Sequence, residues 1–273
     1  MAKHDRLEGK HVFVIGGSKG IGRGIVEAAL AAGARVTLSG STQHSADAAV
    51  ASIRAAQPPE DDNAPLPLLL PLVGIGSDLS RDTVEEDLDA LLAAAAGVQP
   101  IDHIVLTAAD GLAVSDLADL SAARVRDVAH MRMLVPVLLG KLAPRYLLAS
   151  SSSSSSEDKS LTLTTGGIAD RPQRGWSLMS YVMAGANALA RNLALDLAPR
   201  AVRVNAVEPG AVDTPLWGPE GPARDAALEG FAARLPLGRV ASPADVAEAY
   251  VYLMRDRNAT GEVVKTRGGA QLV

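Results

Sequence analysis

The chain reads Val14-Ile15-Gly16-Gly17-Ser18-Lys19-Gly20-Ile21-Gly22 where an apolar run meets a segment of helical period. Glycines at such a strand-to-helix turn let the backbone bend tightly and approach a pyrophosphate, whose charge is favoured by the helix N-terminus. The alternative is a tight turn that binds nothing. The placement favours a ligand, so we expect cofactor contacts from Gly16, Ser18, Lys19, Gly20, Ile21 and Gly22.

Outward from this turn, apolar runs of strand length alternate with helical segments. The expected strands are His11–Ile15, Arg35–Ser39, Leu68–Val73, Asp102–Thr107, Ser160–Thr164, Val202–Val207 and Glu262–Thr266. The expected helices are Gly20–Ala32, Ala46–Ala56, Thr83–Ala96, Ala122–Leu142, Ser177–Leu197 and Pro243–Met254. This alternation predicts an α/β fold of Rossmann type: a doubly wound, seven-stranded parallel sheet with helices on both faces. Ligands are expected at the carboxyl ends of the strands.

Composition narrows the class of protein. The 273 residues are expected to form one dinucleotide-binding domain, with Pro58–Pro67 as an exposed connection and the serine run Ser150–Ser156 as a disordered loop. A net charge of −5 without basic clusters argues against nucleic acid as a partner. The absence of cysteine excludes disulfides and thiolate metal sites, and we expect no metal. Without a signal-like or membrane-spanning apolar run, we expect a soluble cytoplasmic protein and no membrane partner.

Further short motifs follow in order along the chain. They are Ser77-Asp78-Leu79, Thr107-Ala108-Ala109, Arg203-Val204-Asn205, the stretch from Pro209 to Thr214, and Gly268-Gly269. From about Lys10 to Gly269 this pattern resembles the short-chain dehydrogenase/reductase family. The resemblance implies that Asp78 holds adenine and that Thr107, Ala108 and Ala109 end the fourth strand beside the cofactor. It also implies that Pro209, Gly210, Val212 and Thr214 lie beside the nicotinamide amide.

The end of the second strand suggests which cofactor binds. NAD enzymes commonly place an acid there to bind the ribose 2′-hydroxyl. Here Ser39-Gly40-Ser41-Thr42 offers hydroxyls and no carboxylate, so a 2′-phosphate would meet no repulsion. Lys19 stands where NADP-preferring members of the resembled family often carry a basic residue, although it could equally be an ordinary solvated lysine. We therefore expect NADP(H), with contacts from Ser39, Ser41 and Lys19.

The proton-donating pair of the resembled family is missing. That family uses a serine, a tyrosine, a lysine four residues after the tyrosine, and an asparagine on the preceding long helix. The resemblance places the tyrosine position at Met179 and the lysine position at Met183, and neither side chain can donate a proton. Tyr181 is a nearby alternative, but a two-residue shift rotates a helical side chain by about 200°. We expect Tyr181 to be buried or at a helix interface.

Three other residues are candidates for catalysis. The resemblance puts the serine position at Thr165 and the asparagine position at Arg132, while Asp170 lies on the loop that borders the substrate. Arg132 could lower the pKa of Asp170 and keep it ionised. The alternatives are that Arg132 binds a phosphate or pairs with another acid, and that Asp170 pairs with Arg171 or Arg174.

The missing acid suggests the chemistry. Reducing a carbonyl needs a proton at oxygen, whereas reducing an iminium needs only the hydride, because nitrogen already carries the charge that is neutralised. The strings Thr107–Asp110, Gly166-Gly167 and Gly175-Trp176, with Arg132 and Asp170, resemble fungal reductase/Diels–Alderases of bicyclic indole alkaloid pathways. We expect an atypical NADP(H)-dependent reductase of a small-molecule secondary metabolite, such as an imine or iminium. A cofactor-binding cyclase or isomerase and a non-catalytic dinucleotide-binding protein remain open alternatives.

Two further expectations concern the surroundings of the site. A loop over residues 213–238 is expected to cover the substrate, with Trp176, Trp217 and Phe231 as the few aromatic residues available to line its cavity. The long Ala- and Leu-rich helices Ala122–Leu142 and Ser177–Leu197 resemble the dimer-forming helices of the family. The expected assembly is a homodimer or homotetramer.

Overall fold

The computed structural model describes residues 6–56, 71–147 and 158–273, so the serine run and the proline-rich connection lie outside the described residues. Its centre is a parallel seven-stranded sheet with strand order β3-β2-β1-β4-β5-β6-β7. The strands are β1 His11–Ile15, β2 Arg35–Gly40, β3 Leu72–Gly76, β4 His103–Leu106, β5 Lys159–Thr164, β6 Val202–Pro209 and β7 Val263–Thr266. The order reverses direction at β1, which confirms the predicted doubly wound sheet of Rossmann type.

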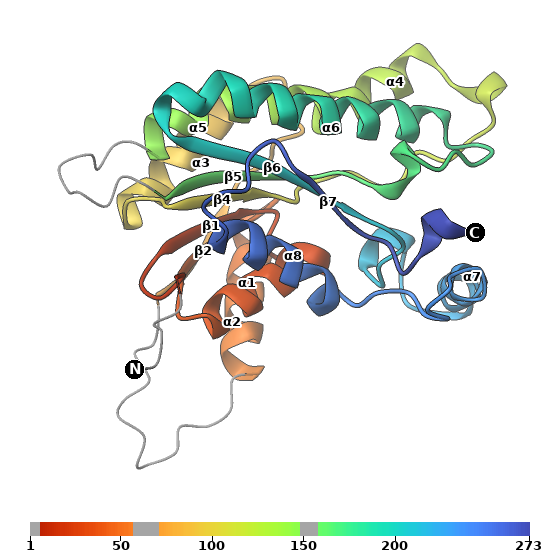
Figure 1. The fold of residues 1–273 in the computed structure, drawn as a ribbon, viewed down its shortest axis with the longest axis horizontal. Coiled ribbons are helices and arrows are strands. Elements are labelled where there is room, and N and C mark those ends of the chain that lie inside the picture. The colour runs from red at the N-terminus through yellow and green to blue at the C-terminus, as the bar shows by residue number, and fades with distance from the viewer. Residues whose placement is uncertain (1–5, 57–70, 148–157) are drawn as a thin grey trace.

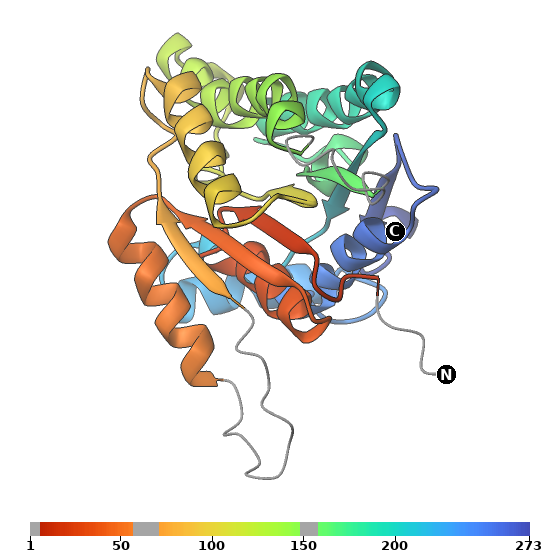
Figure 2. The ribbon, with the colours of Figure 1, turned by 90° about the vertical axis from the view of Figure 1, so that its left-hand side faces the viewer.

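Helices cover both faces of this sheet (Figure 1). On one face lie α1 Gly20–Ala31, α2 Gln43–Ala56 and α8 Pro243–Arg255, and on the other lie α3 Val84–Val98, α5 Val135–Leu147 and α6 Ser177–Leu197. Each face buries its own apolar cluster, built almost entirely from Val, Leu, Ile and Ala. The view along the sheet in Figure 2 shows the two helix layers with the sheet between them. Small aliphatic side chains suit such close packing of helix on sheet.

Three expected elements differ from the structure. The third strand is Leu72–Gly76, because Gly74 and Gly76 continue it where α2 approaches, and residues 68–70 of the expected span Leu68–Val73 lie outside the described residues. A Cβ on Gly76 would lie 2.1 Å from the backbone nitrogen of Gln43, so only glycine fits. The helix expected over Ala122–Leu142 is α4 Ala122–Ala129, a π-helical segment His130–Leu134 and α5. The expected loop over residues 213–238 contains a helix, α7 Pro222–Ala232.

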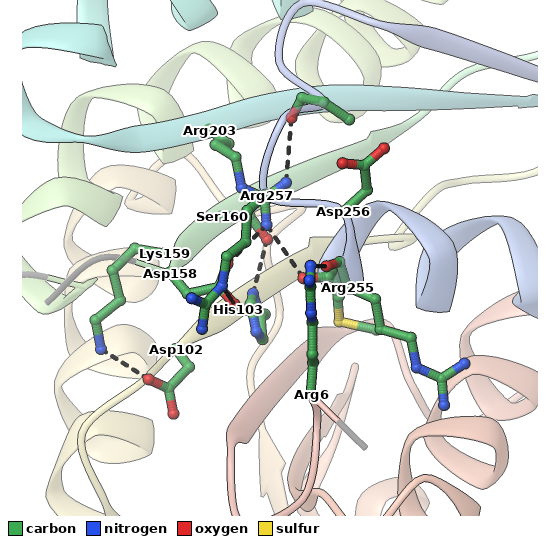
Figure 3. A network of polar contacts seen from close by, with 12 residues as sticks. Arg6, Asp102, His103, Asp158, Lys159, Ser160, Arg203, Arg255, Asp256 and Arg257 are labelled. Atoms are coloured by element: carbon green, nitrogen blue, oxygen red, sulfur yellow. Dashed lines mark hydrogen bonds and ion pairs between the residues drawn. The ribbon is translucent and has the colours of Figure 1, made fainter. Parts of the chain in front are cut away.

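Buried charges close the amino-terminal edge of β4, β5 and β6 (Figure 3). Asp158, immediately before β5, accepts a hydrogen bond from Arg203 at 3.0 Å and one from Arg257 at 3.1 Å. His103 Nδ1 lies 2.8 Å from the Ser160 hydroxyl, and burial lowers the pKa of His103 to about 4. The buried polar groups at this edge of the sheet therefore pair with one another, and we assign them a structural role.

Within the three described ranges, no helix combines the length and apolar character needed to cross a bilayer.

Candidate functional site

A cavity of about 910 Å³ opens at the carboxyl ends of the strands, at the edge opposite the buried charge network. It is bounded by the turns that follow β1 to β6, by the inner face of α6, and by the segment that leads into and includes α7. All residues expected to bind the cofactor line it: Gly16, Ser18, Lys19, Gly20, Ile21, Gly22, Ser39, Ser41, Asp78, Thr107, Ala108, Ala109, Pro209, Gly210, Val212 and Thr214. Residues separated by up to two hundred positions thus share one wall.

The glycine turn is shaped by close backbone contacts. Gly16 has φ +88°, and a Cβ there would lie 2.5 Å from the nitrogen of Ala108. A Cβ on Gly22 would lie 2.2 Å from the Gly16 carbonyl oxygen. The Gly16 N–H donates to the Ser39 hydroxyl at 3.1 Å, and the Thr107 hydroxyl donates to the Gly16 carbonyl at 3.1 Å. These contacts therefore fix the conformation of the turn at the start of α1. The free N–H groups at the start of a helix favour the binding of an anion.

The region expected to hold the adenosine ribose carries one cation and one acid. Lys19 is exposed and, within the described parts of the chain, has no carboxylate within 4.0 Å. Asp78 is exposed and accepts hydrogen bonds from the Ser80 hydroxyl at 2.6 Å and the Ser80 N–H at 3.0 Å. These hydrogen bonds keep the pKa of Asp78 below its usual value. Ser41 is exposed at the rim, whereas Ser39 is buried and its hydroxyl supports the glycine turn.

Two methionines stand where a proton donor would be needed. Met179 is 2% exposed and Met183 is 5% exposed, and both line the cavity from α6. Met183 also packs against Gly166, where its sulfur lies 3.5 Å from the position of an added Cβ. Tyr181 is 61% exposed and is not among the residues that line the cavity. The expectation that Tyr181 is buried within this chain is therefore wrong, because its position on α6 points away from the sheet.

Arg132 lines the cavity from the π-helical segment. It does not form the ion pair with Asp170 that the sequence analysis suggested. Its Nε lies 2.8 Å from Asp110 Oδ1, and its Nη2 donates to the Asp110 carbonyl at 2.6 Å. Burial lowers the pKa of Arg132, and the Asp110 carboxylate opposes that shift. Asp110 lines the cavity as well, so the acid beside Arg132 comes from the chain just after β4.

Asp170 lies outside the cavity lining and belongs to a different cluster. Its carboxylate binds Lys265 and, at 2.8 Å, Arg267 Nη2, and neither Arg171 nor Arg174 forms an ion pair with it. The hydrogen bond from Lys265 is the main reason why the pKa of Asp170 is lowered. Thr165 does line the cavity, but its hydroxyl donates to the Val207 carbonyl at 3.3 Å.

Sequence reasoning missed the partners of Asp170. Arg267 is 2% exposed, lines the cavity and forms an ion pair with Glu208, which is fully buried in β6. Asn187 on α6 donates to the other oxygen of Glu208 at 2.7 Å. Glu208 at the end of a strand that is buried throughout was the available signal, because a buried carboxylate requires a partner.

Aromatic residues gather on one side of the cavity. Trp176, Trp217 and Phe231 all line it, as expected. The rings of Trp217 and Phe231 pack at an angle of 57° with their centroids 4.8 Å apart, and the Arg234 guanidinium lies 4.8 Å from the Phe231 centroid. Trp217 is fixed because its Nε1 donates to the Val212 carbonyl at 2.8 Å. The chain has only two tryptophans, and both face this space.

Comparison with known proteins agrees with this architecture. The protein-family model for the SDR-like Rossmann domain matches residues 3–273 of this chain. The short-chain dehydrogenase/reductase ATR9 of Stachybotrys chlorohalonatus is 34% identical over 97% of this chain and 98% of its own length. The structure of the MalC reductase/Diels-Alderase from Malbranchea aurantiaca superposes with a TM-score of 0.85 at 36% identity, covering 99% of this chain and 98% of MalC.

A more distant structure bears on the cofactor. A short-chain dehydrogenase from Burkholderia cenocepacia in complex with NADP has a TM-score of 0.79 and 25% identity, over 97% of this chain and 99% of the other. The predicted class, an oxidoreductase of this fold, is thereby confirmed, as is the predicted similarity to the fungal reductase/Diels–Alderases. The chain belongs to the short-chain dehydrogenase/reductase family.

Proposed function

We propose that the protein is an NADPH-dependent reductase of imines or iminium ions that works without a tyrosine-lysine proton relay. The observation that carries this proposal is the position of Met179 and Met183, which line the cavity and offer no proton. A positioned acid commonly contributes about 10²- to 10⁴-fold to a reaction that needs one. A substrate whose nitrogen already bears the charge loses nothing by the absence of that acid.

The cavity fits a dinucleotide. Gly16 and Gly22 let the turn pack directly against the backbone at Ala108 and Gly16, and both residues line the cavity at the start of α1, where the first N–H groups of a helix favour a phosphate. Bound NADPH would supply a hydride. Lys19, which lacks a carboxylate partner in the described chain, and the hydroxyl of Ser41 would hold the 2′-phosphate, while Asp78 would contact adenine. Thr107, Ala108, Ala109, Pro209, Gly210, Val212 and Thr214 would support the remaining part of the cofactor.

The residues at the inner end of the cavity then have distinct roles. Met179 and Met183 keep water from the reacting carbon, since both are apolar and nearly inaccessible. Asp110 provides the carboxylate that we expected from Asp170, and Arg132 keeps it oriented through the 2.8 Å ion pair. A negative group near an iminium stabilises the bound substrate. Thr165, whose hydroxyl still has an acceptor position, would orient the substrate.

The test compares substrates and restores the relay. Wild-type protein is expected to oxidise NADPH with cyclic imines such as 1-pyrroline or 3,4-dihydroisoquinoline, and not with matched cyclic ketones. The double variant Met179→Tyr with Met183→Lys should gain ketone reduction while its imine activity changes little. The matched control is Tyr181→Phe, which removes the exposed hydroxyl and should alter neither activity. Turnover of ketones alone by the wild type would contradict the proposal.

A second candidate function is cyclisation in the same cavity. It is favoured by the similarity to the MalC reductase/Diels-Alderase and by the aromatic wall formed by Trp217 and Phe231. Such a wall can hold a large apolar substrate in a folded conformation, which accelerates an intramolecular reaction by orientation. Product mass separates the two functions, because reduction adds two hydrogens and isomerisation adds none.

We also propose a homodimer or homotetramer that associates through α5 and α6. Apolar side chains on these helices and the π-helical segment are exposed in the single chain, among them Leu134, Val137, Tyr181 and Leu195. Contiguous exposed apolar residues commonly mark an interface. Light scattering of the wild type and of Leu195→Asp would test this assembly, with a monomer expected for the variant if α6 lies at the interface.

A further inference from the structure

Arg267 occupies an unusual place for a charged residue. It directly follows β7, its side chain is 2% exposed, and it contributes to the wall of the cavity. Two glycines make room for it: a Cβ on Gly210 would lie 3.0 Å from Arg267 Cα, and one on Gly167 would lie 3.3 Å from Arg267 Cδ. Both glycines also line the cavity, so this arginine lies beneath a thin wall without side chains.

Most of the hydrogen-bonding capacity of Arg267 is unused. Its Nη2 contacts both Asp170, at 2.8 Å, and Glu208. Its Nε and Nη1 are buried and have no acceptor in the described chain. A guanidinium has five N–H bonds, of which Nε and Nη1 hold three. Buried donors in native proteins nearly always have a partner, and these three N–H groups have none among the described residues, which leaves them able to bind an acceptor from outside the described chain.

The Nε of Arg267 lies beneath Gly167, a residue that lines the cavity. A Cβ on Gly167 would lie 3.5 Å from Arg267 Nε, so a side chain there would cover this atom. The two acids lie on the Nη2 side and hold the guanidinium in place: Glu208 is fully buried and is itself fixed by Asn187, and Asp170 is also bound by Lys265. The guanidinium is therefore preorganised: its two acids hold Nη2, and its Nε lies beneath Gly167.

The charge of the cavity adds a second observation. Among the described residues, its lining contains the cations Lys19, Arg132, Arg171, Arg234 and Arg267 but only two acids, Asp78 and Asp110. Arg171 and Arg234 have no carboxylate within 4.0 Å among residues 6–56, 71–147 and 158–273. Arg171 donates to the Ala270 carbonyl at 2.6 Å, which places it beside the segment that follows Arg267.

We propose that Arg267 and Arg171 form a binding subsite for a carboxylate of the substrate, with Glu208 and Asp170 as residues that position Arg267. A carboxylate matches these donors because it accepts several charge-assisted hydrogen bonds at once. The inference rests on the proposed function in that the substrate is taken to occupy this end of the cavity. It narrows the substrate to an imine or iminium that carries a carboxylate elsewhere in the molecule.

Fluorescence provides a test that does not depend on turnover. Because both tryptophans of the chain line the cavity, a ligand there should change the intrinsic fluorescence. The full-length protein, saturated with NADP⁺ so that the phosphate sites are filled, is titrated with cyclohexanecarboxylate and separately with cyclohexanecarboxamide. The two probes have nearly the same shape and differ in charge. We expect the carboxylate to bind at least about tenfold more tightly.

Variants show whether Arg267 is responsible. Arg267→Gln alone would leave Glu208 buried without a partner, so it is combined with Glu208→Gln, which keeps a neutral amide pair. This double variant and Arg171→Gln should each lose most of the preference for carboxylate. Arg145→Gln is the matched control, since Arg145 is a paired but exposed arginine of α5 that does not line the cavity. It should retain the preference.

The outcomes separate this inference from the proposed function. Equal affinity for the two probes would overturn it, as would a carboxylate preference that survives in the double variant. Tight carboxylate binding without NADPH oxidation on any imine would support the subsite and argue against the reductase. NADPH oxidation with imines that lack a carboxylate, at rates unchanged by the double variant, would support the reductase and argue against the subsite.

Discussion

Two buried arginines at opposite edges of the sheet have opposite surroundings. Arg203, at the amino-terminal edge, gives Nη1 to the carbonyls of Leu253 and Ala259, and Nη2 to Asp158 and the Met254 carbonyl. Within the described residues, only its Nε lacks an acceptor. Arg267, at the carboxyl edge, has partners in the same residues through Nη2 alone. Neither arginine is more than one-tenth exposed, so burial alone does not distinguish a structural arginine from one that we propose binds a ligand. The two differ in how many nitrogens lack an acceptor in the described chain: Nε in Arg203, and both Nε and Nη1 in Arg267.

The largest expected effect lies at the amino-terminal edge. Arg203→Leu should lower the free energy of unfolding by about 3–5 kcal/mol, because it leaves Asp158 with a single half-exposed partner, Arg257, and leaves several buried carbonyls without a donor. Denaturant unfolding measures this change. The control is Arg200→Leu at an exposed position, where a change within about 0.5 kcal/mol is expected. A loss of NADPH affinity at unchanged stability would invalidate the contrast between the two edges.

The same edge should make stability depend on pH. Burial lowers the pKa of His103 from 6.5 to about 4, so between these values the unfolded chain binds a proton that the folded chain does not. The free energy of unfolding should therefore fall as the pH falls through this window, by about 3 kcal/mol in total for this residue, and level off below it.

Denaturation curves of wild type and His103→Gln, taken from pH 7 to pH 4, isolate this contribution. Burial also lowers the pKa of His11, which adds a slope of the same sign to both proteins. The variant should show a shallower dependence on pH. Parallel curves for the two proteins would mean that His103 takes up its proton in the folded state.

A smaller effect is expected at the carboxyl edge, where we propose that cations without acid partners in the described chain bind ligands. Lys19→Ala should weaken NADPH binding about tenfold and leave NADH binding nearly unchanged, because only NADPH carries the 2′-phosphate. Its effect on stability should be negligible, since Lys19 has no ion pair in the described chain. Isothermal titration with both cofactors measures the ratio. An equal loss for both cofactors would assign Lys19 to the pyrophosphate.

The smallest effect on stability is expected for Asp170→Asn. This residue is 42% exposed in its side chain, so its ion pairs with Lys265 and Arg267 should contribute less than about 1 kcal/mol. The substitution should nevertheless reduce the preference for cyclohexanecarboxylate severalfold, because Arg267 loses one of the two groups that hold it. A direct contact with substrate would instead abolish binding of both probes.

Much of the fold could be read from the chain. The runs of buried aliphatic residues identified all seven strands, and β3 continues beyond its predicted end at Val73, because glycines at positions 74 and 76 interrupt the apolar pattern. The π-helical turn at Arg132 left no periodic signal, and α7 was hidden by a sequence rich in Gly, Pro and Ala. Short-range patterns record which segments are buried, not where the backbone deviates to fit a neighbour.

The candidate site shows the same difference between what local sequence patterns predict and what tertiary packing determines. The sequence by itself determined the glycine turn, the absence of an acid at the end of β2, and the methionines at positions 179 and 183, since each follows from residue type and local spacing. Only the tertiary structure decided that Arg132 pairs with Asp110, that Asp170 faces Lys265 and Arg267, and that Arg267 borders the cavity. A charge finds its partner across strands and loops that lie far apart in the chain, so its pairing depends on the packing of the whole sheet.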